Sequence, residues 1–172
     1  ASELASNAHV RDKIFTLARK GLPIYAECGG LMYLCTTLFS AGHAHSMVGV
    51  FPFQAKLSRK PQGHGYTLAR VSRPNPFYRV GYEFYGHEFH YSKCLPPDGQ
   101  SCVQEPCLQM LRGTGLGQSQ DGLLFRNTFA CYTHVHALSV PDWAENFVQA
   151  AATYRRCLEQ GLDECPDIRM PS

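Results

Sequence analysis

The sequence predicts an α/β fold in which helices pack on a mainly parallel β-sheet, and three observations support this prediction. A helix, a strand and a second helix follow one another within residues 7–39. Short apolar runs separated by Gly and Pro fill the middle of the chain, and an amphipathic helix closes it. Alternation of helix and strand is typical of parallel strands, because these need long crossover connections.

Apolar spacing and boundary residues define the N-terminal elements. The first helix is expected to start at the caps Ser6 and Asn7 and to stop at Lys20-Gly21. Residues 23–26 form a short apolar run of the kind that buried parallel strands use. Behind Cys28-Gly29-Gly30, a second helix is expected from four residues at helical spacing, Leu31, Leu34, Cys35 and Leu38.

The rest of the chain is expected to form strands, loops and one further helix. The predicted strands lie at residues 47–53, 66–71, 82–91, 107–111, 123–125 and 129–132, and residues 95–122 otherwise have a loop composition. The last helix is predicted from the 0, 4, 7, 11 spacing of Phe147, Ala151, Tyr154 and Leu158. We expect one domain over residues 1–161 and a loose tail over residues 162–172.

Composition excludes several classes of protein. The 172 residues fit one domain or a large piece of one, and 44% hydrophobic with 17% charged residues excludes disorder and a charged coiled coil. Scattered basic residues and a net charge of +2 predict neither a nucleic-acid nor a membrane partner. Without a membrane span or a signal peptide, a cytoplasmic location is expected. The eight cysteines are expected to be reduced thiols.

The strongest local signal is the segment around Cys28. A strand that ends at Cys28, two glycines and a following helix are the parts of a nucleophile elbow. The helix N-terminus is expected to lower the pKa of the Cys28 thiol, and the backbone N–H of Gly29 is expected to bind an oxyanion. The alternative is a buried structural cysteine at the end of a strand.

A cysteine nucleophile needs an imidazole as its base. Two clusters offer one, His87 with His90 in residues 86–92 and His134 with His136 in residues 132–136. On a strand, His134 and His136 share a face, as metal ligands would require, but a third and a fourth ligand must come from elsewhere. Metal binding is therefore the weaker alternative. Three other histidines are expected in solvated loops: His43, His45 and His64.

Taken together, these motifs resemble the glutamine amidotransferase domain of the cobyrinic acid a,c-diamide synthase family. The matching segments are residues 23–34, 65–66, 86–92 and 132–136, followed by the helix over 142–158. They keep the order of the family across residues 4–160. The resemblance implies a three-layer class I fold with helices on both faces of a mainly parallel sheet. The family's Pro-Gly-Gly segment, which supplies a second oxyanion donor, is expected upstream of Ala1.

The resemblance also implies residue roles. Cys28 would attack the side-chain amide of glutamine to give a thioester and ammonia, and His134 would be the catalytic histidine. The class usually has a Glu two residues after that histidine, but this position is His136, so a Cys/His dyad is expected. Possible contacts to glutamine, with a structural role equally open, are Glu27, His90, Tyr91 and Ser92. No metal site is expected.

The implied partners are glutamine, an ATP-dependent ligase domain of the same protein and, through that domain, a corrinoid whose a and c carboxylates are amidated in cobalamin biosynthesis. The sequence has no Gly-x-x-x-x-Gly-Lys-Ser/Thr motif, so ATP and Mg²⁺ are expected in the ligase domain and no cofactor in this chain. Two alternatives stay open: a catalytically silent docking module of this fold, and a Cys-dependent hydrolase with another substrate.

Overall fold

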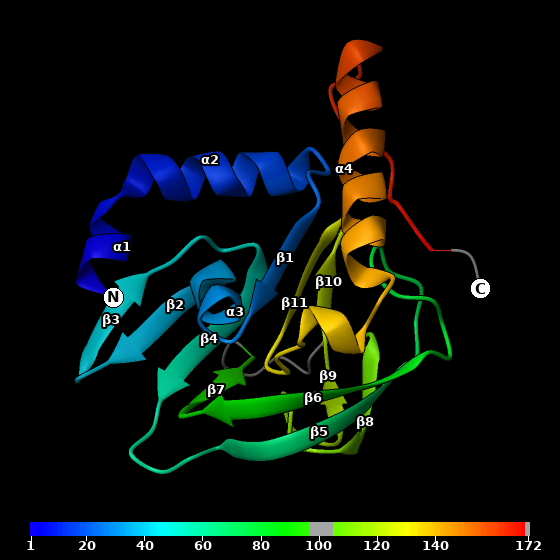
Figure 1. Ribbon diagram of the computed structural model, residues 1–172. Helices are drawn as coiled ribbons and strands as arrows, with labels where there is room; N and C mark the ends of the chain where they lie inside the picture. The colour runs from blue at the N-terminus through cyan, green and yellow to red at the C-terminus, as the bar shows by residue number, and fades with distance from the viewer. Residues whose placement is uncertain (97–104, 171–172) are drawn as a thin grey trace.

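The computed structural model describes residues 1–96 and 105–170, and Figure 1 shows its helices and strands. In chain order the elements are α1 (Ser2–Ser6), α2 (Ala8–Arg19), β1 (Ile24–Glu27), α3 (Gly29–Leu34), β2 (Cys35–Ser40), β3 (His43–Ser46), β4 (Phe51–Leu57), β5 (Gly63–Val71), β6 (Glu83–His90), β7 (Ser92–Leu95), β8 (Leu108–Arg112), β9 (Gln120–Asp121), β10 (Leu123–Phe125), β11 (Thr128–Cys131), the 3-10 helix η1 (Ala137–Ser139) and α4 (Trp143–Glu159).

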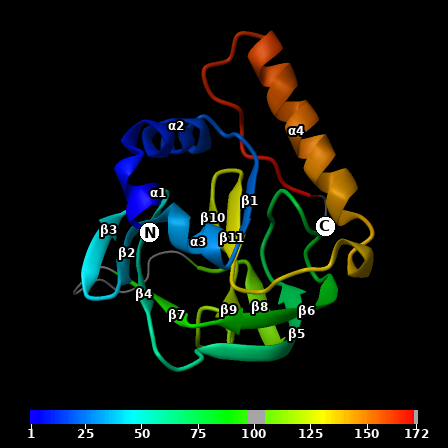
Figure 2. The same ribbon diagram turned by 60° about the vertical axis from the view of Figure 1, so that its left-hand side comes forward.

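A three-stranded sheet lies at the centre of the fold, with β11 between a parallel β1 and an antiparallel β10. Side chains alternate across this sheet. Ala26 and Ala130 pack on the side of α2 and α3, whereas Tyr25 and Phe129 pack on the side of α4. Helices therefore cover both faces of this sheet, as Figure 2 shows, and the predicted layered α/β arrangement is confirmed.

The prediction of a mainly parallel sheet is wrong. In the described part of the chain, β1–β11 and β2–β4 are parallel, and the other six strand pairings are antiparallel. Two further four-stranded sheets have the orders β3-β2-β4-β7 and β6-β5-β8-β9. The physical reason is the short connections rich in Gly and Pro in the middle of the chain, which can join antiparallel strands but are too short for helical crossovers.

The second predicted helix is also shorter than expected. α3 ends at Leu34, and Cys35 begins β2, which pairs with β3 and β4. Cys35 and Leu38 are buried in the core as expected, but from a strand. The Thr36 hydroxyl donates a hydrogen bond to the Phe53 carbonyl at 2.8 Å, and β-branched residues such as Thr36 favour strands. The neighbouring strands therefore decide the structure of this segment.

Two other predicted helices are confirmed. The Asn7 side chain caps α2 by accepting a hydrogen bond from the Val10 backbone N–H at 3.2 Å. α4 buries Ala150, Tyr154 and Cys157, so the prediction that Ala151 and Leu158 lie on the buried face is wrong by about one residue of rotation. None of the described helices combines the length and the apolar content of a membrane span.

The predicted loose tail packs on the domain over residues 162–170. The backbone N–H of Cys165 donates to the Lys20 carbonyl at 2.9 Å, and that of Ile168 donates to the Asn127 side chain at 2.7 Å. The Sγ atoms of Cys157 and Cys165 lie 2.7 Å apart in a small cluster at the end of α4. The tail is ordered because it satisfies buried polar groups, a long-range effect that local sequence does not reveal.

Candidate active site

Cys28 lies on a strained turn between β1 and α3. Its backbone has φ 46° and ψ −96°, a conformation that costs of order 1–3 kcal/mol for a residue with a Cβ atom. The turn is fixed from both sides: the Cys28 N–H donates to the Cys131 carbonyl at 2.8 Å, and its carbonyl accepts from the Met32 N–H at 3.0 Å. The sharp turn predicted at this position is therefore present.

The pKa of the Cys28 thiol is raised, whereas the sequence predicts that it is lowered. Burial raises the pKa of the thiol above its ordinary value of 9.0, and a hydrogen bond from the Gly29 N–H, which lowers it, does not compensate. Cys28 is half-buried, whereas the other described cysteines are buried free thiols: Cys35, Cys94, Cys107, Cys131, Cys157 and Cys165. Cys102 lies outside the described residues. Because the short helix α3 does not overcome burial, Cys28 is a thiol at neutral pH and needs a base.

His134 lies just beyond the end of β11, next to the end of β1. Glu27 and Cys131 are partners in the parallel register, so the segments that carry Cys28 and His134 leave adjacent strands at the same edge of the sheet. The backbone of His134 exchanges two hydrogen bonds with that of His87 on β6, at 2.7 and 3.0 Å. The two imidazole rings stack with their centroids 5.0 Å apart.

Glu27 provides the carboxylate that the sequence neighbours of His134 lack. Its Oε2 lies 3.4 Å from Nδ1 of His134, and its Oε1 accepts a hydrogen bond from the Val135 N–H at 3.1 Å. The expected dyad without a carboxylate is therefore incorrect in this respect. A carboxylate on Nδ1 holds the imidazole in the tautomer whose Nε2 can accept a proton.

His136 lies at the position where the class usually has a Glu, but it has a structural role in this chain. Its Nδ1 accepts a hydrogen bond from the Leu138 N–H at 3.3 Å and so caps η1. His136 is exposed. The described residues contain no group of three or more His, Cys, Asp and Glu side chains that could hold a metal ion.

His90 and Ser92, for which a glutamine contact and a structural role are equally open from the sequence, are enclosed in the core. The Nδ1–H of His90 donates to the Ser92 carbonyl at 2.9 Å, while Nε2 lies 3.3 Å from the Glu88 carboxylate. Both side chains support Tyr132: the His90 ring stacks on it at 3.8 Å, and the Ser92 hydroxyl bonds its hydroxyl at 2.8 Å. Neither is open to a ligand. Tyr91 is 39% exposed and packs on an aromatic neighbour.

Asp121 is a buried support of the site that sequence reasoning missed. Its carboxylate accepts hydrogen bonds from the backbone N–H groups of Tyr132 and Thr133, at 3.0 and 2.9 Å, and so fixes the two residues before His134. The side chain is fully buried, and burial raises the pKa of this carboxyl group despite these bonds. In the sequence, Asp121 is marked only by the Asp-Gly pair that it forms with Gly122, which is typical of turns and does not indicate a buried carboxylate.

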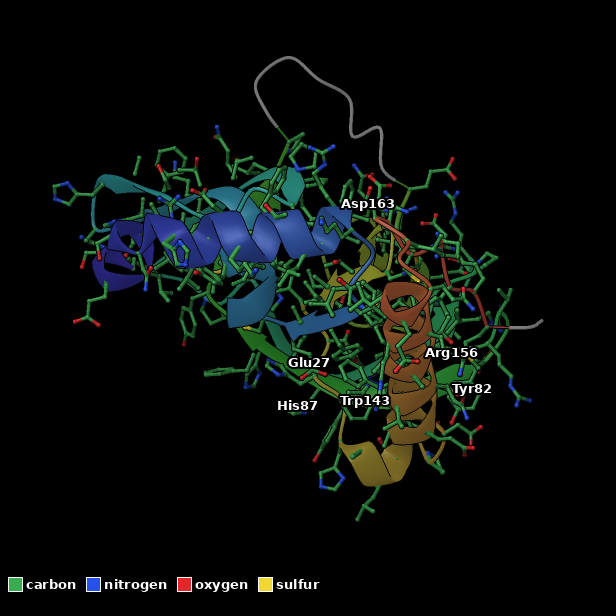
Figure 3. All side chains as sticks on the ribbon, turned by 90° about the horizontal axis from the view of Figure 1, so that it is seen from above. Glu27, Tyr82, His87, Trp143, Arg156 and Asp163 are labelled. Atoms are coloured by element: carbon green, nitrogen blue, oxygen red, sulfur yellow. The ribbon has the colours of Figure 1, made fainter. Side chains whose placement is uncertain are left out.

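A cavity of about 310 Å³ adjoins the Glu27 carboxylate on the side of α4. Its lining residues are Tyr25, Glu27, Val135, Ala137 and Trp143. Figure 3 shows Glu27 and His87 close together beside Trp143, at the start of α4. The Trp143 Nε1–H is buried without a hydrogen-bond partner, so it is free to donate to a bound molecule. The thiol and the imidazole thus leave the ends of adjacent strands, a carboxylate faces the imidazole, and the cavity lies beside that carboxylate.

Comparisons with known proteins identify the family of this chain. Residues 1–141 match the CobB/CobQ-like glutamine amidotransferase domain. Similar curated proteins include the cobyrinate a,c-diamide synthases of Methanosphaera stadtmanae, 42% identical over 87% of this chain and 32% of that protein, and of Salmonella typhimurium, 34% identical over 88% and 32%. The chain spans about a third of the length of these relatives.

Solved structures show the same fold. The crystal structure of a glutamine amidotransferase matches with a TM-score of 0.59 and 15% identity, over 88% of this chain and 72% of the other. The crystal structure of a putative GMP synthase component from Thermoplasma acidophilum matches with a TM-score of 0.54 and 17% identity, over 91% and 71%.

Proposed function

Because the chain belongs to the family of CobB/CobQ-like glutamine amidotransferase domains, we propose that it is the glutaminase part of an ATP-dependent cobyrinate a,c-diamide synthase. In this role it hydrolyses glutamine and supplies ammonia, which the ligase part uses to amidate the a and c carboxylates of a corrinoid precursor in cobalamin biosynthesis. Three curated relatives that carry this name, 37–42% identical to the chain, support the assignment. In this proposal, ATP and Mg²⁺ serve the ligase part.

The chemistry begins with the protonated thiol of Cys28. His134 Nε2 takes the thiol proton while the sulfur attacks the side-chain amide carbon of glutamine, and the Gly29 N–H stabilises the oxyanion that forms. The imidazolium then returns the proton to the amide nitrogen, which leaves as ammonia and yields a thioester. Water, deprotonated by the same imidazole, attacks the thioester and releases glutamate and the Cys28 thiol.

Glu27 supports each proton transfer because its carboxylate lies beside Nδ1 of His134. The carboxylate stabilises the imidazolium that forms after the thiol has lost its proton. The single observation that carries the proposal is this convergence at one sheet edge: the strained turn at Cys28, His134 on the adjacent strand end, and Glu27 facing His134.

The test uses 6-diazo-5-oxo-norleucine, a glutamine-like electrophile, with the purified synthase. We expect peptide mapping to find the label on Cys28, and we expect Cys28→Ser to abolish both labelling and glutamate release. Cys107→Ala is the matched control, because Cys107 is a buried thiol in a different cluster and its loss should leave both signals intact.

The outcomes separate the alternatives. Label spread over several cysteines, or equal glutamate release from wild type and Cys28→Ser, would rule out the proposal and favour a silent docking module. Turnover of a peptide or ester without turnover of glutamine would favour a Cys-dependent hydrolase.

A further inference from the structure

The outer face of the β5–β6 hairpin exposes an unusual group of aromatic side chains. Tyr66, Tyr85 and Phe89 are 74%, 68% and 54% exposed. Beside them on η1, Leu138 is 85% exposed. We call these four residues the aromatic face. Single exposed apolar residues are ordinary, but several rings on one surface are typical of a contact with another protein.

Strand alternation explains why these rings point outward. Residues Thr67, Ala69, Phe84 and Glu88 of the same two strands are buried, so the hairpin has one side in the core and one side outside. In the antiparallel register Leu68 faces Tyr85, Tyr66 faces His87 and His64 faces Phe89. Figure 1 shows the two strands running side by side across the base of the molecule.

The aromatic face continues directly to the active site. His87 faces Tyr66 on one side and pairs with His134 on the other, at the outer edge of β6. Directly opposed residues place their side chains on the same face of a sheet. Tyr66, His87 and His134 therefore form one row across three adjacent segments, and the stacked rings of His87 and His134 join its last two members.

Charge on this face is balanced. Arg70 and Glu83, at the far end of the hairpin, bond each other at 2.6 Å. Two residues along β6 from Glu83, the Ser139 hydroxyl of η1 donates to the Tyr85 carbonyl at 3.4 Å, which keeps η1 beside β6. A partner that covers these rings would therefore meet an apolar surface bordered by paired polar groups, as in stable protein interfaces.

We propose that the aromatic face is the surface on which the ammonia-consuming, ATP-dependent ligase part of the synthase docks, an inference that rests on the proposed function. About two thirds of the length of the synthase relatives lies outside the match to this chain, so a large partner is available. Ammonia that escapes to water is protonated and lost to the ligase. A partner seated on Tyr66 and His87 lies next to His134, where ammonia is released, and can receive it directly.

Hydroxyl-radical footprinting of the intact synthase tests the docking without any substitution. Tyr82, which is 37% exposed and stacks on the inward-facing Phe84, is an internal reference. Without a docked partner, the exposed fractions of the side chains predict that Tyr66 and Tyr85 are labelled more than Tyr82. With the ligase part docked on them, they should label less than Tyr82. An unchanged order overturns the proposal, as does protection that appears only at concentrations where the synthase forms dimers, which would identify a second copy as the occupant.

A second measurement follows the coupling of the two activities. Tyr66→Lys and Phe89→Lys should leave glutamate release intact but raise the ratio of glutamate formed to ADP formed by at least about threefold, because ammonia leaks. Amidation driven by added ammonium should be unaffected. Val148→Lys on α4, at a residue 65% exposed, is the matched control and should keep the wild-type ratio.

The results distinguish this inference from the proposed function. A wild-type ratio in both Lys variants overturns the docking surface while glutaminase activity stands. Absence of glutamate release from the wild-type synthase refutes the proposed function itself, whatever the footprint shows.

Discussion

The Glu27 carboxylate faces Nδ1 of His134 at 3.4 Å, although Glu27 is the sequence neighbour of Cys28 and not of the histidine. The parallel pairing of β1 with β11 brings the two together, and the Val135 N–H fixes the other carboxylate oxygen at 3.1 Å. The position where the class usually carries its Glu is His136, which caps η1. The site thus obtains its carboxylate from the strand of the nucleophile.

Glu27→Gln should lower kcat about 10- to 100-fold with little change in KM, because the amide no longer stabilises the imidazolium of His134. Steady-state glutamate release as a function of glutamine concentration measures both constants. The two constants separate the roles of Glu27. If Glu27 instead contacted the amino acid part of glutamine, which the sequence leaves open, KM would rise.

His136→Ala is the control for this prediction. Loss of the η1 cap should cost about 1 kcal/mol of stability and leave kcat close to wild type. A larger fall in kcat for His136→Ala than for Glu27→Gln would contradict the assignment of Glu27.

Glu88→Gln should destabilise the fold near neutral pH by about 1–3 kcal/mol, because the buried Glu88 carboxylate accepts hydrogen bonds from the backbone N–H groups of Thr114 and Gly115. Burial raises the pKa of Glu88, but bonds from His90 and from the N–H groups of Thr114 and Gly115 outweigh it and hold the pKa below 4.5. A carboxylate whose pKa is lower in the folded state than in the unfolded state stabilises the fold at pH values above its unfolded-state pKa. This stabilisation is lost as the pH falls through its folded-state pKa.

Urea denaturation of wild type and Glu88→Gln between neutral and acidic pH tests this dependence. The stability difference should be constant at neutral pH and should shrink below the ordinary glutamate pKa of 4.5. A difference that grows on acidification would show that the sign is wrong.

Gly86→Ala should displace His134 from β6. A Cβ atom at residue 86 would lie 2.5 Å from the His134 carbonyl oxygen and 2.7 Å from Cγ2 of Thr133. Overpacking of this kind costs about 1–3 kcal/mol, and misplacing a catalytic group by about 1 Å can cost on the order of 10²-fold in rate. Thermal unfolding and glutamate release should both report the change.

Glu83→Ala on the same strand is the matched control, because its ion pair with Arg70 is exposed and contributes little to stability. It should behave like wild type in both assays. Normal activity of Gly86→Ala would mean that contact with β6 does not set the position of His134.

Local signals predicted much of the framework. The Asn7 cap and the apolar spacing of α2, and the turn at Cys28-Gly29-Gly30, depend on residues a few positions apart, and the structure contains both. By contrast, Cys35–Ser40 has apolar residues that fit a helix or a strand equally well. Only its pairing with β3 and β4 resolves that ambiguity, as backbone groups must find partners at a distance.

The sequence by itself determined the layered α/β class, the strained turn that presents Cys28 and the family to which the chain belongs. The tertiary structure decided which carboxylate faces His134, that His90 and Ser92 are enclosed around Tyr132, and that the aromatic face borders the site. Turns and caps arise from contacts within a few residues, so sequence alone displays them. Glu27 and Val135 are 108 positions apart, and their contact exists only because the strands of one sheet end side by side.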